Sequence, residues 1–180
     1  MPRYVAFLRA INLGATRKFP KAEIRRCVEA TGATAVETHI NTGNVRLTTT
    51  IRSREKLERT LEEVFAADRG FAVPTIAFSP PELAVIGRDS TRLAESVGSA
   101  TFRQYVTLLK TEPPAAAAAG LEELSNDGEQ AHVRGRAVHV VLLERGYARF
   151  RLDNARIEQR LGVATTRDAK VIAALVQKWC

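Results

Sequence analysis

Apolar positions in the first 79 residues change their period several times, and each change marks a different predicted element. Residues 4–9 form a short apolar run with the length of a strand. Within residues 21–31, the apolar residues Ile24, Cys27 and Val28 recur at intervals typical of a helix with one buried stripe. The other predicted elements are strands at 36–40 and 44–49, a helix from Ser53 to near Gly70, and a strand at 73–78. The predicted order is β-α-β-β-α-β.

A similar order restarts after a segment with a weaker pattern. Residues 80–100 predict a short helix around Glu82 to Ile86 and then a linker rich in Gly, Ser and Arg. The later predicted elements are a strand at 102–110, an Ala-rich helix to Leu124, strands at 130–133 and 137–143, a helix that stops at Gly162, and a last helix over 171–176. This order is β-α-β-β-α with an added helix, so it lacks or modifies the final strand.

Both halves match the split βαβ, or ferredoxin-like, arrangement of strands and helices. The sequence therefore predicts an α+β protein with two ferredoxin-like lobes, the second of them modified, packed with a cleft between them. The predicted boundaries are 1–79 for the first lobe, 80–100 for a linker with the short helix, and 101–180 for the second lobe with its extra C-terminal helix.

The composition agrees with a globular protein, since 45% of the 180 residues are hydrophobic and 26% are charged. No apolar stretch approaches the roughly 18 to 20 residues of a membrane span, and the opening run is too short for a signal-peptide core. We therefore expect a cytoplasmic protein with no membrane partner. The only two cysteines, Cys27 and Cys180, exclude a disulfide framework and a cysteine-rich metal site.

The net charge of +7 is concentrated in two segments. Residues 1–26 carry seven basic and one acidic side chain, and residues 145–170 carry seven basic and three acidic ones. One interpretation is an ordinary solvated surface, since Arg and Ala are abundant throughout the chain. The other is an anion-binding face for nucleic acid, a nucleotide or another phosphorylated partner. Charge alone does not choose among these ligands.

Several classes of enzyme find no support in the residues. Of the three histidines, only His132 and His139 can meet, diagonally across a predicted hairpin, and two ligands make a weak metal site. No Ser or Cys stands in a nucleophile motif, and no glycine-rich phosphate or dinucleotide fingerprint follows a strand. We therefore predict no metal and no cofactor. Noncovalent binding remains, or catalysis by Asn, Arg, Thr and Glu on a phosphorylated or carboxylated substrate.

Polar residues of the first half allow a structural or a binding role. Asn41, Gly43 and Asn44 lie at a predicted hairpin turn, where Asn and Gly adopt positive φ and bond to the local backbone. A turn role explains them, and ligand binding is the alternative. Arg9 ends the first predicted strand and Asn12 follows it, so either could face a cleft or simply meet solvent.

In the second half, Glu158 lies one helical turn after Asn154, where it could position a substrate, act as a base or pair with a nearby Arg. Thr165, Thr166 and Arg167 stand between two predicted helices. We expect them at or just before a helix N-terminus, which attracts anions through its free N–H groups. The alternative is that a Thr only caps this helix.

Three segments of the chain, Tyr4 to Gly14, Thr38 to Leu47 and Leu152 to Val171, resemble the signature segments of the bacterial domain-of-unknown-function family 1697. The resemblance implies a small cytosolic α+β protein with two ferredoxin-like subdomains, and it implies no activity. The family's recurrent polar positions fall on Arg9, Asn12, Asn41, Gly43, Asn44, Asn154, Glu158, Thr165, Thr166 and Arg167.

The chain departs from the family pattern at a few positions. Ala10 replaces a usual Gly, and Thr42 replaces a usual Ser. Asp168 and Ala169 stand where the family typically has Asn-Trp. If that ring stacks against a ligand in relatives, we expect this protein to bind the ligand less well.

The favoured hypothesis is noncovalent binding of an anionic ligand, such as a nucleotide, nucleic acid or phosphorylated metabolite, in a basic site between the lobes. One alternative is a small enzyme or ligand-dependent regulator that uses Asn, Arg, Thr and Glu without a metal. Another is a protein-interaction module with no ligand. Whether the protein is an enzyme and whether it forms oligomers stay open at this stage.

Overall fold

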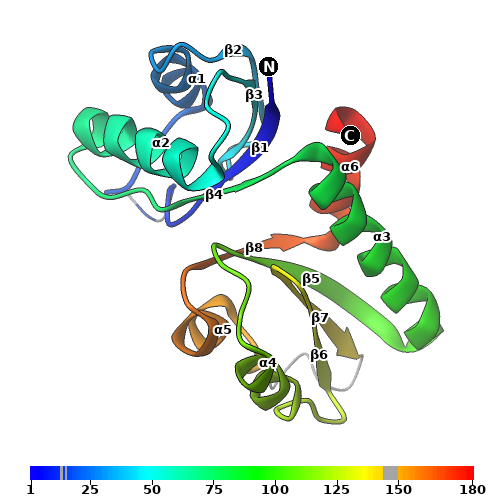
Figure 1. Cartoon of the computed structure of the whole chain (residues 1–180). Helices are drawn as coiled ribbons and strands as arrows, with labels where there is room; N and C mark the ends of the chain where they lie inside the picture. Colours follow the sequence, from blue (N-terminus) through cyan, green and yellow to red (C-terminus); the bar gives the residue numbers. More distant parts are fainter. Residues whose placement is uncertain (13, 15, 144–149) are drawn as a thin grey trace. The chain divides into compact units, whose positions relative to one another are not determined.

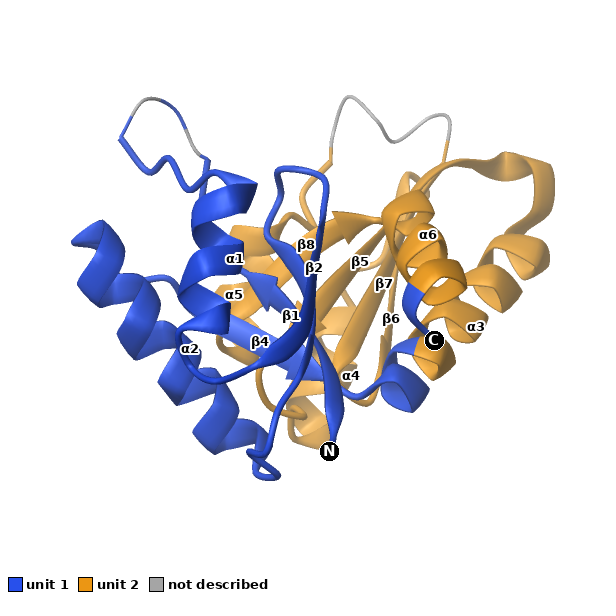
Figure 2. Ribbon diagram, turned by 90° about the horizontal axis from the view of Figure 1, so that it is seen from above, with its two compact units in different colours: residues 1–83, 179–180 blue, residues 84–178 orange. Residues whose placement is uncertain are grey.

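The computed structural model describes residues 1–12, 14, 16–143 and 150–180 (Figure 1). Arg145 and Arg149, which belong to the second basic segment, lie outside the described residues. The chain divides into two compact units, residues 1–83 with 179–180 and residues 84–178 (Figure 2). Each unit contains one four-stranded antiparallel sheet, so the α+β class is confirmed.

The first unit has the six elements that the sequence predicts. They are β1 (Arg3–Leu8), α1 (Lys21–Glu29), β2 (Thr34–His39), β3 (Asn44–Thr48), α2 (Arg54–Arg69) and β4 (Thr75–Phe78). The strand order is β2-β3-β1-β4, and every neighbouring pair is antiparallel. Ser53 caps α2 by accepting a hydrogen bond from the Lys56 N–H (3.1 Å), and Gly70 ends the helix with φ 71°.

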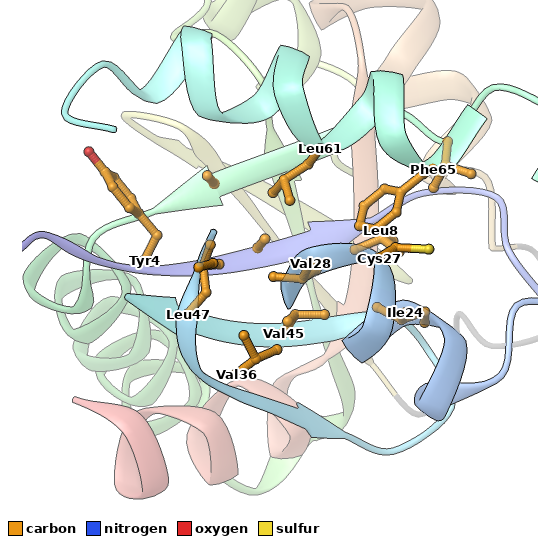
Figure 3. Close-up of a cluster of buried hydrophobic side chains, with 14 of the residues drawn as sticks. Tyr4, Leu8, Ile24, Cys27, Val28, Val36, Val45, Leu47, Leu61 and Phe65 are labelled. Carbon is orange, nitrogen blue, oxygen red and sulfur yellow. The ribbon is translucent and has the colours of Figure 1, made fainter. Parts of the chain in front are cut away.

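One face of this sheet forms a core with α1 and α2. The predicted stripe of α1 is buried there, and the inward side chains of the strands meet those of both helices (Figure 3). Phe19 and Phe65 pack edge to face in this core, with their ring centroids 5.2 Å apart. Trp179, far along the chain, belongs to the same unit, and its Nε1–H donates to Glu37 Oε2 (3.1 Å).

The second unit repeats the order of the first and adds helices at its two ends. Its elements are α3 (Pro80–Val97), a short 3₁₀ turn (Gly98–Ala100), β5 (Thr101–Leu109), α4 (Ala115–Glu122), β6 (Glu129–Arg134), β7 (Ala137–Leu143), α5 (Asn154–Leu161), β8 (Ala164–Asp168) and α6 (Ala169–Trp179). The strand order is β6-β7-β5-β8, again antiparallel throughout. The first residues of α3 and the last residue of α6 are assigned to the first unit.

Helix α3 covers most of residues 80–100, where the sequence predicts only a short helix followed by a linker. Ser79 and Glu82 form a capping box, since Glu82 Oε2 accepts from the Ser79 N–H at 2.7 Å and the Ser79 hydroxyl accepts from the Glu82 N–H at 3.4 Å. Pro80 and Pro81 occupy the first turn, where a missing N–H costs nothing. The cap therefore starts a continuous helix of 18 residues, which includes much of the predicted linker.

Strand β8 is the second difference, because the sequence predicts no strand between the last two helices. Residues 164–168 pair with β5, with Thr165 opposite Leu108 and Arg167 opposite Val106. The segment has little apolar alternation, so its pattern is weak, although the two Thr residues favour an extended backbone. The second sheet is therefore complete rather than lacking its last strand.

No helix of the described chain is both long and apolar enough to span a bilayer.

Candidate functional site

The loop after β1 and the turn between β2 and β3 lie together in the first unit. The Asn12 side-chain amide donates to the Asn41 carbonyl oxygen (2.6 Å), and its Oδ1 accepts from the Phe19 N–H (2.8 Å). Asn12 has φ 55°, a left-handed conformation that Asn tolerates. Asn12 therefore holds the two loops together, which is a structural role.

The turn itself also has a structural explanation. Asn44 is fully buried, and its amide donates to the His39 carbonyl (3.1 Å) and the Thr42 hydroxyl (2.9 Å). Gly43 has φ 78°, and a Cβ there would lie 2.7 Å from the Cβ of Leu8. The turn role considered for these residues is thus supported. Ligand binding by Arg9, Asn12, Asn41 and Asn44 stays a prediction.

Three of the seven basic side chains of residues 1–26, those of Arg17, Arg25 and Arg26, form hydrogen bonds or ion pairs within the first unit. Arg17 donates to the carbonyl oxygens of Ala10 and Ala72 (both 2.6 Å). Arg25 pairs with Glu29, and Arg26 pairs with Glu23 and Asp68. The hydrogen bond from Arg26 lowers the pKa of Asp68 and keeps this carboxylate charged. This segment therefore offers an anion fewer uncompensated charges than its composition suggests.

The structure places Thr165, Thr166 and Arg167 just before the N-terminus of α6, as expected, but on a strand that the sequence does not predict. They lie on β8, where successive side chains point to opposite faces of the sheet. Thr166 contacts the Thr107 hydroxyl (2.7 Å) and Asn154 Oδ1 (3.0 Å). Arg167, on the other face, is only 7% exposed and donates to the Thr165 hydroxyl (2.8 Å). The two hydroxyls and the guanidinium therefore do not converge on one position where an anion could bind.

Burial also changes the chemistry of Arg167. Removal from water lowers the pKa of its guanidinium to about 10, because the charged form is less stable in the interior. On the opposite face, Glu158 Oε1 lies 3.5 Å from the Ala164 N–H at the start of β8. Glu158 and Arg167 thus both have contacts within the second unit, and their roles toward a ligand stay predictions.

The histidine and cysteine side chains that the sequence offers for chemistry, His132, His139 and Cys27, lie in surroundings that do not activate them. His132 and His139 are direct cross-strand neighbours on β6 and β7, rather than diagonal ones as predicted from the hairpin. Burial lowers the pKa of His139 to about 4 and raises the pKa of the Cys27 thiol to about 11. Within the described ranges, no three His, Cys, Asp or Glu side chains are grouped closely enough to hold a metal ion.

A groove of about 440 Å³ opens in the second unit where β5 begins and β8 meets α6. We call it the β5–α6 groove, and it is lined by Thr101, Phe102, Arg103, Gln104, Asp168, Ala169 and Lys170. Gln104 fixes the strand beneath it by donating to the Ser90 carbonyl oxygen of α3 (3.0 Å). The Phe102 side chain remains 54% exposed.

The charged groups of the groove are arranged around the start of α6. Arg103 Nε lies 3.1 Å from Asp168 Oδ2, and the guanidinium lies 5.0 Å from the centroid of the Tyr105 ring. Asp168 Oδ1 accepts from the Lys170 N–H (2.9 Å) and so caps the helix. Two cations and an aromatic ring can together bind a phosphate that carries a planar group.

Only part of this groove is recognisable in the sequence. Lys170 lies in the second basic segment, and Asp168 is one of the departures from the family pattern. Phe102 and Arg103 were missed, because the pairing of β5 with β8 is what brings them beside residues 65 positions later. The signal available in the sequence was an aromatic residue followed by a basic residue at the start of a predicted strand.

Comparison with known proteins finds a family and a shared fold. The sequence model described as "Protein of unknown function (DUF1697)" matches residues 1–139. A solved structure of a conserved bacterial protein from Streptococcus pneumoniae superposes with a TM-score of 0.70 at 23% sequence identity, covering 98% of this chain and 97% of that one. This likeness shows the fold alone. Among curated proteins, nothing matches the chain.

Proposed function

The chain belongs to the DUF1697 family of proteins of unknown function, and we propose that it binds a nucleotide noncovalently in the β5–α6 groove. The observation that carries this proposal is the presence of the Phe102 ring, Arg103 and Lys170 in one groove of about 440 Å³. That volume lies within the range of about 300 to 1,000 Å³ typical of small-ligand sites.

Each of the three side chains supplies a different part of nucleotide recognition. The Arg103 guanidinium presents a planar set of donors to two phosphate oxygens, and Lys170 adds a point charge. The exposed face of Phe102 offers a surface on which a base can stack. Asp168 opposes the two cations with one negative charge and keeps Arg103 in place before a ligand arrives.

A nucleotide is favoured over a long nucleic acid. Binding of a polyanion gains affinity from many phosphate contacts, each of which releases counterions. Arg17, Arg25 and Arg26 of the first basic segment are engaged in hydrogen bonds and ion pairs within the first unit. The proposal therefore assigns the ligand one phosphate group beside the groove rather than a tract of phosphates.

The strand orders support a finer classification of the fold as well. In each unit the strands follow the order 2-3-1-4, counted within the unit, with antiparallel neighbours. This order supports the proposal that each unit is a split βαβ, ferredoxin-like arrangement. The cleft between the lobes stays a prediction.

Isothermal titration calorimetry with AMP, adenosine and inorganic phosphate tests the function. We expect AMP to bind more tightly than either of its parts. The double variant Arg103→Ala/Lys170→Ala should weaken AMP binding at least about tenfold, since charge-assisted hydrogen bonds contribute about 1.5 to 3 kcal/mol. Phe102→Ala should weaken AMP binding without changing phosphate binding.

The matched control is Lys56→Ala/Arg59→Ala, which removes one Lys and one Arg from the exposed surface of α2. This variant should bind AMP as the unchanged protein does. Absence of AMP binding up to about 1 mM, or equal weakening by the control variant, would reject the proposal.

A further inference from the structure

We propose that the second unit has another ligand site, independent of the nucleotide groove, in which an aliphatic carboxylate binds between α3 and α6. The two helices lie side by side in both views of the molecule (Figures 1 and 2). A groove of about 420 Å³ separates their outer surfaces, and we call it the α3–α6 groove. It is lined by Gly87, Arg88, Thr91, Arg92, Ala173, Val176 and Gln177.

Close helix packing gives this groove an apolar floor. A Cβ at Gly87 would lie 2.9 Å from Val176 Cγ2, so the absence of a side chain lets α3 approach α6. Ala173 and Val176 add aliphatic surface from the other helix. The Thr91 hydroxyl donates to the Gly87 carbonyl oxygen (3.1 Å), so this polar group is already satisfied inside α3. The floor therefore suits a hydrocarbon chain.

The rim of the groove is positively charged. Arg88 and Arg92 are exposed and lie four residues apart, one turn along the same face of α3. Among the described residues that line the groove, none is acidic. Asp89, the neighbouring carboxylate on α3, interacts electrostatically with His139 of the sheet. The two guanidinium groups thus provide excess positive charge beside the apolar floor.

This combination selects an amphiphilic anion. A guanidinium binds a carboxylate through two parallel hydrogen bonds, and each apolar carbon removed from water adds affinity. The volume lies in the ordinary range for small-ligand sites, which are mainly apolar with a few convergent polar groups. By contrast, the β5–α6 groove contains Asp168 and an aromatic ring, so the two sites should prefer different ligands.

Backbone amide chemical shifts of the full chain, followed by NMR during titration with octanoate, locate this site directly. We expect saturable shifts at residues 87–92 and 173–177. Acetate tests the carboxylate without the chain, and octylammonium tests the chain with the opposite charge. Both should bind at least about tenfold more weakly than octanoate.

Variants separate binding at the groove from general affinity for an amphiphile. Arg88→Ala/Arg92→Ala should weaken octanoate binding at least about tenfold, and Ala173→Trp should obstruct the groove. Lys56→Ala/Arg59→Ala is the control and should bind octanoate unchanged. Equal binding of octylammonium or acetate, shifts centred on other residues, or unchanged binding by Arg88→Ala/Arg92→Ala would each overturn the proposal. AMP binding is read separately, so failure here leaves the nucleotide proposal intact.

Discussion

The Glu58 carboxylate of α2 accepts a hydrogen bond from the backbone N–H of Ala77, 2.7 Å away on the edge strand β4. Glu62, one turn later, accepts from the Thr75 N–H at 2.8 Å. In the second unit, Glu122 accepts from the Val133 N–H of β6 at 2.6 Å. Carboxylates from the helices therefore satisfy donors that an edge strand would otherwise offer to another chain.

Replacing Glu58 should destabilise the first unit. The side chain is only 2% exposed, so Glu58→Ala leaves a buried N–H without its acceptor, at a cost of about 1 to 3 kcal/mol in the free energy of unfolding. Urea denaturation measures this loss. Glu58→Gln keeps an acceptor oxygen and should lose less, and Glu63→Ala, at an exposed position of α2, should change little. Equal losses for Glu58→Ala and Glu63→Ala would show that the edge contact contributes no stability.

Gly43→Ala should destabilise the protein through two effects that a matched variant can separate. Positive φ costs an L-residue about 1 to 2 kcal/mol, and the new Cβ would also lie 2.7 Å from the Cβ of Leu8. Gly32 has φ 81° with nothing within 4 Å of its added Cβ, so Gly32→Ala reports the backbone effect alone. Thermal and urea unfolding should show the larger loss for Gly43→Ala. Identical losses would mean that the turn moves away from Leu8 without cost.

The buried His139 should make stability depend on pH. Its pKa falls from 6.5 to about 4 in the folded state, because burial disfavours the charged ring. Between these values the unfolded chain binds more protons than the folded one, so stability rises with pH from about 4 to 6.5 and is lost as pH falls. The total effect is on the order of 3 kcal/mol.

The measurement is the free energy of unfolding across that pH interval for His139→Leu and for the unchanged protein. Leu cannot be protonated, so the variant should lose most of the slope. His39→Gln, which changes a half-buried histidine of the other unit, should keep it. An unaltered slope in His139→Leu would assign the acid sensitivity to other groups.

Asp168→Asn should increase the affinity of the β5–α6 groove for AMP, if the nucleotide proposal holds. The change removes the negative charge 3.1 Å from Arg103, while Asn still caps α6. We expect AMP to bind about three- to tenfold more tightly, with the gain shrinking as salt screens the charges. Asp168→Ala loses the cap as well, so it distinguishes charge from helix stability. Unchanged AMP binding by Asp168→Asn would place the phosphate away from this carboxylate, and weaker binding would contradict the expected repulsion.

Local signals in the sequence predicted most of the first unit. The stripe of Ile24, Cys27 and Val28 and the Ser53 cap depend on neighbours within a few residues, and both occur as expected. Strand β8 is different, because its five residues gain their conformation from pairing with β5. The contact between Thr107 and Thr166 joins residues 59 positions apart. A single sequence contains no local pattern for such a pairing.

The same distinction between local signals and long-range pairing applies to the candidate site. The turn at Asn44 was recognisable, because Asn and Gly have intrinsic turn preferences. The groove at Arg103 was not, since Asp168 reaches it only through the sheet. The alternation of β8 also separated Thr165 and Arg167 from Thr166, a division that depends on knowing that the segment is a strand.

The hydrogen bond between Trp179 and Glu37 has a consequence for the order in which the chain acquires its structure during synthesis. The two residues are 142 positions apart, yet both belong to the first unit. At about 5 to 20 residues per second, a ribosome needs roughly 7 to 28 s to travel from one to the other. The N-terminal unit therefore leaves the ribosome first but completes its contacts only after the whole of the second unit has been made.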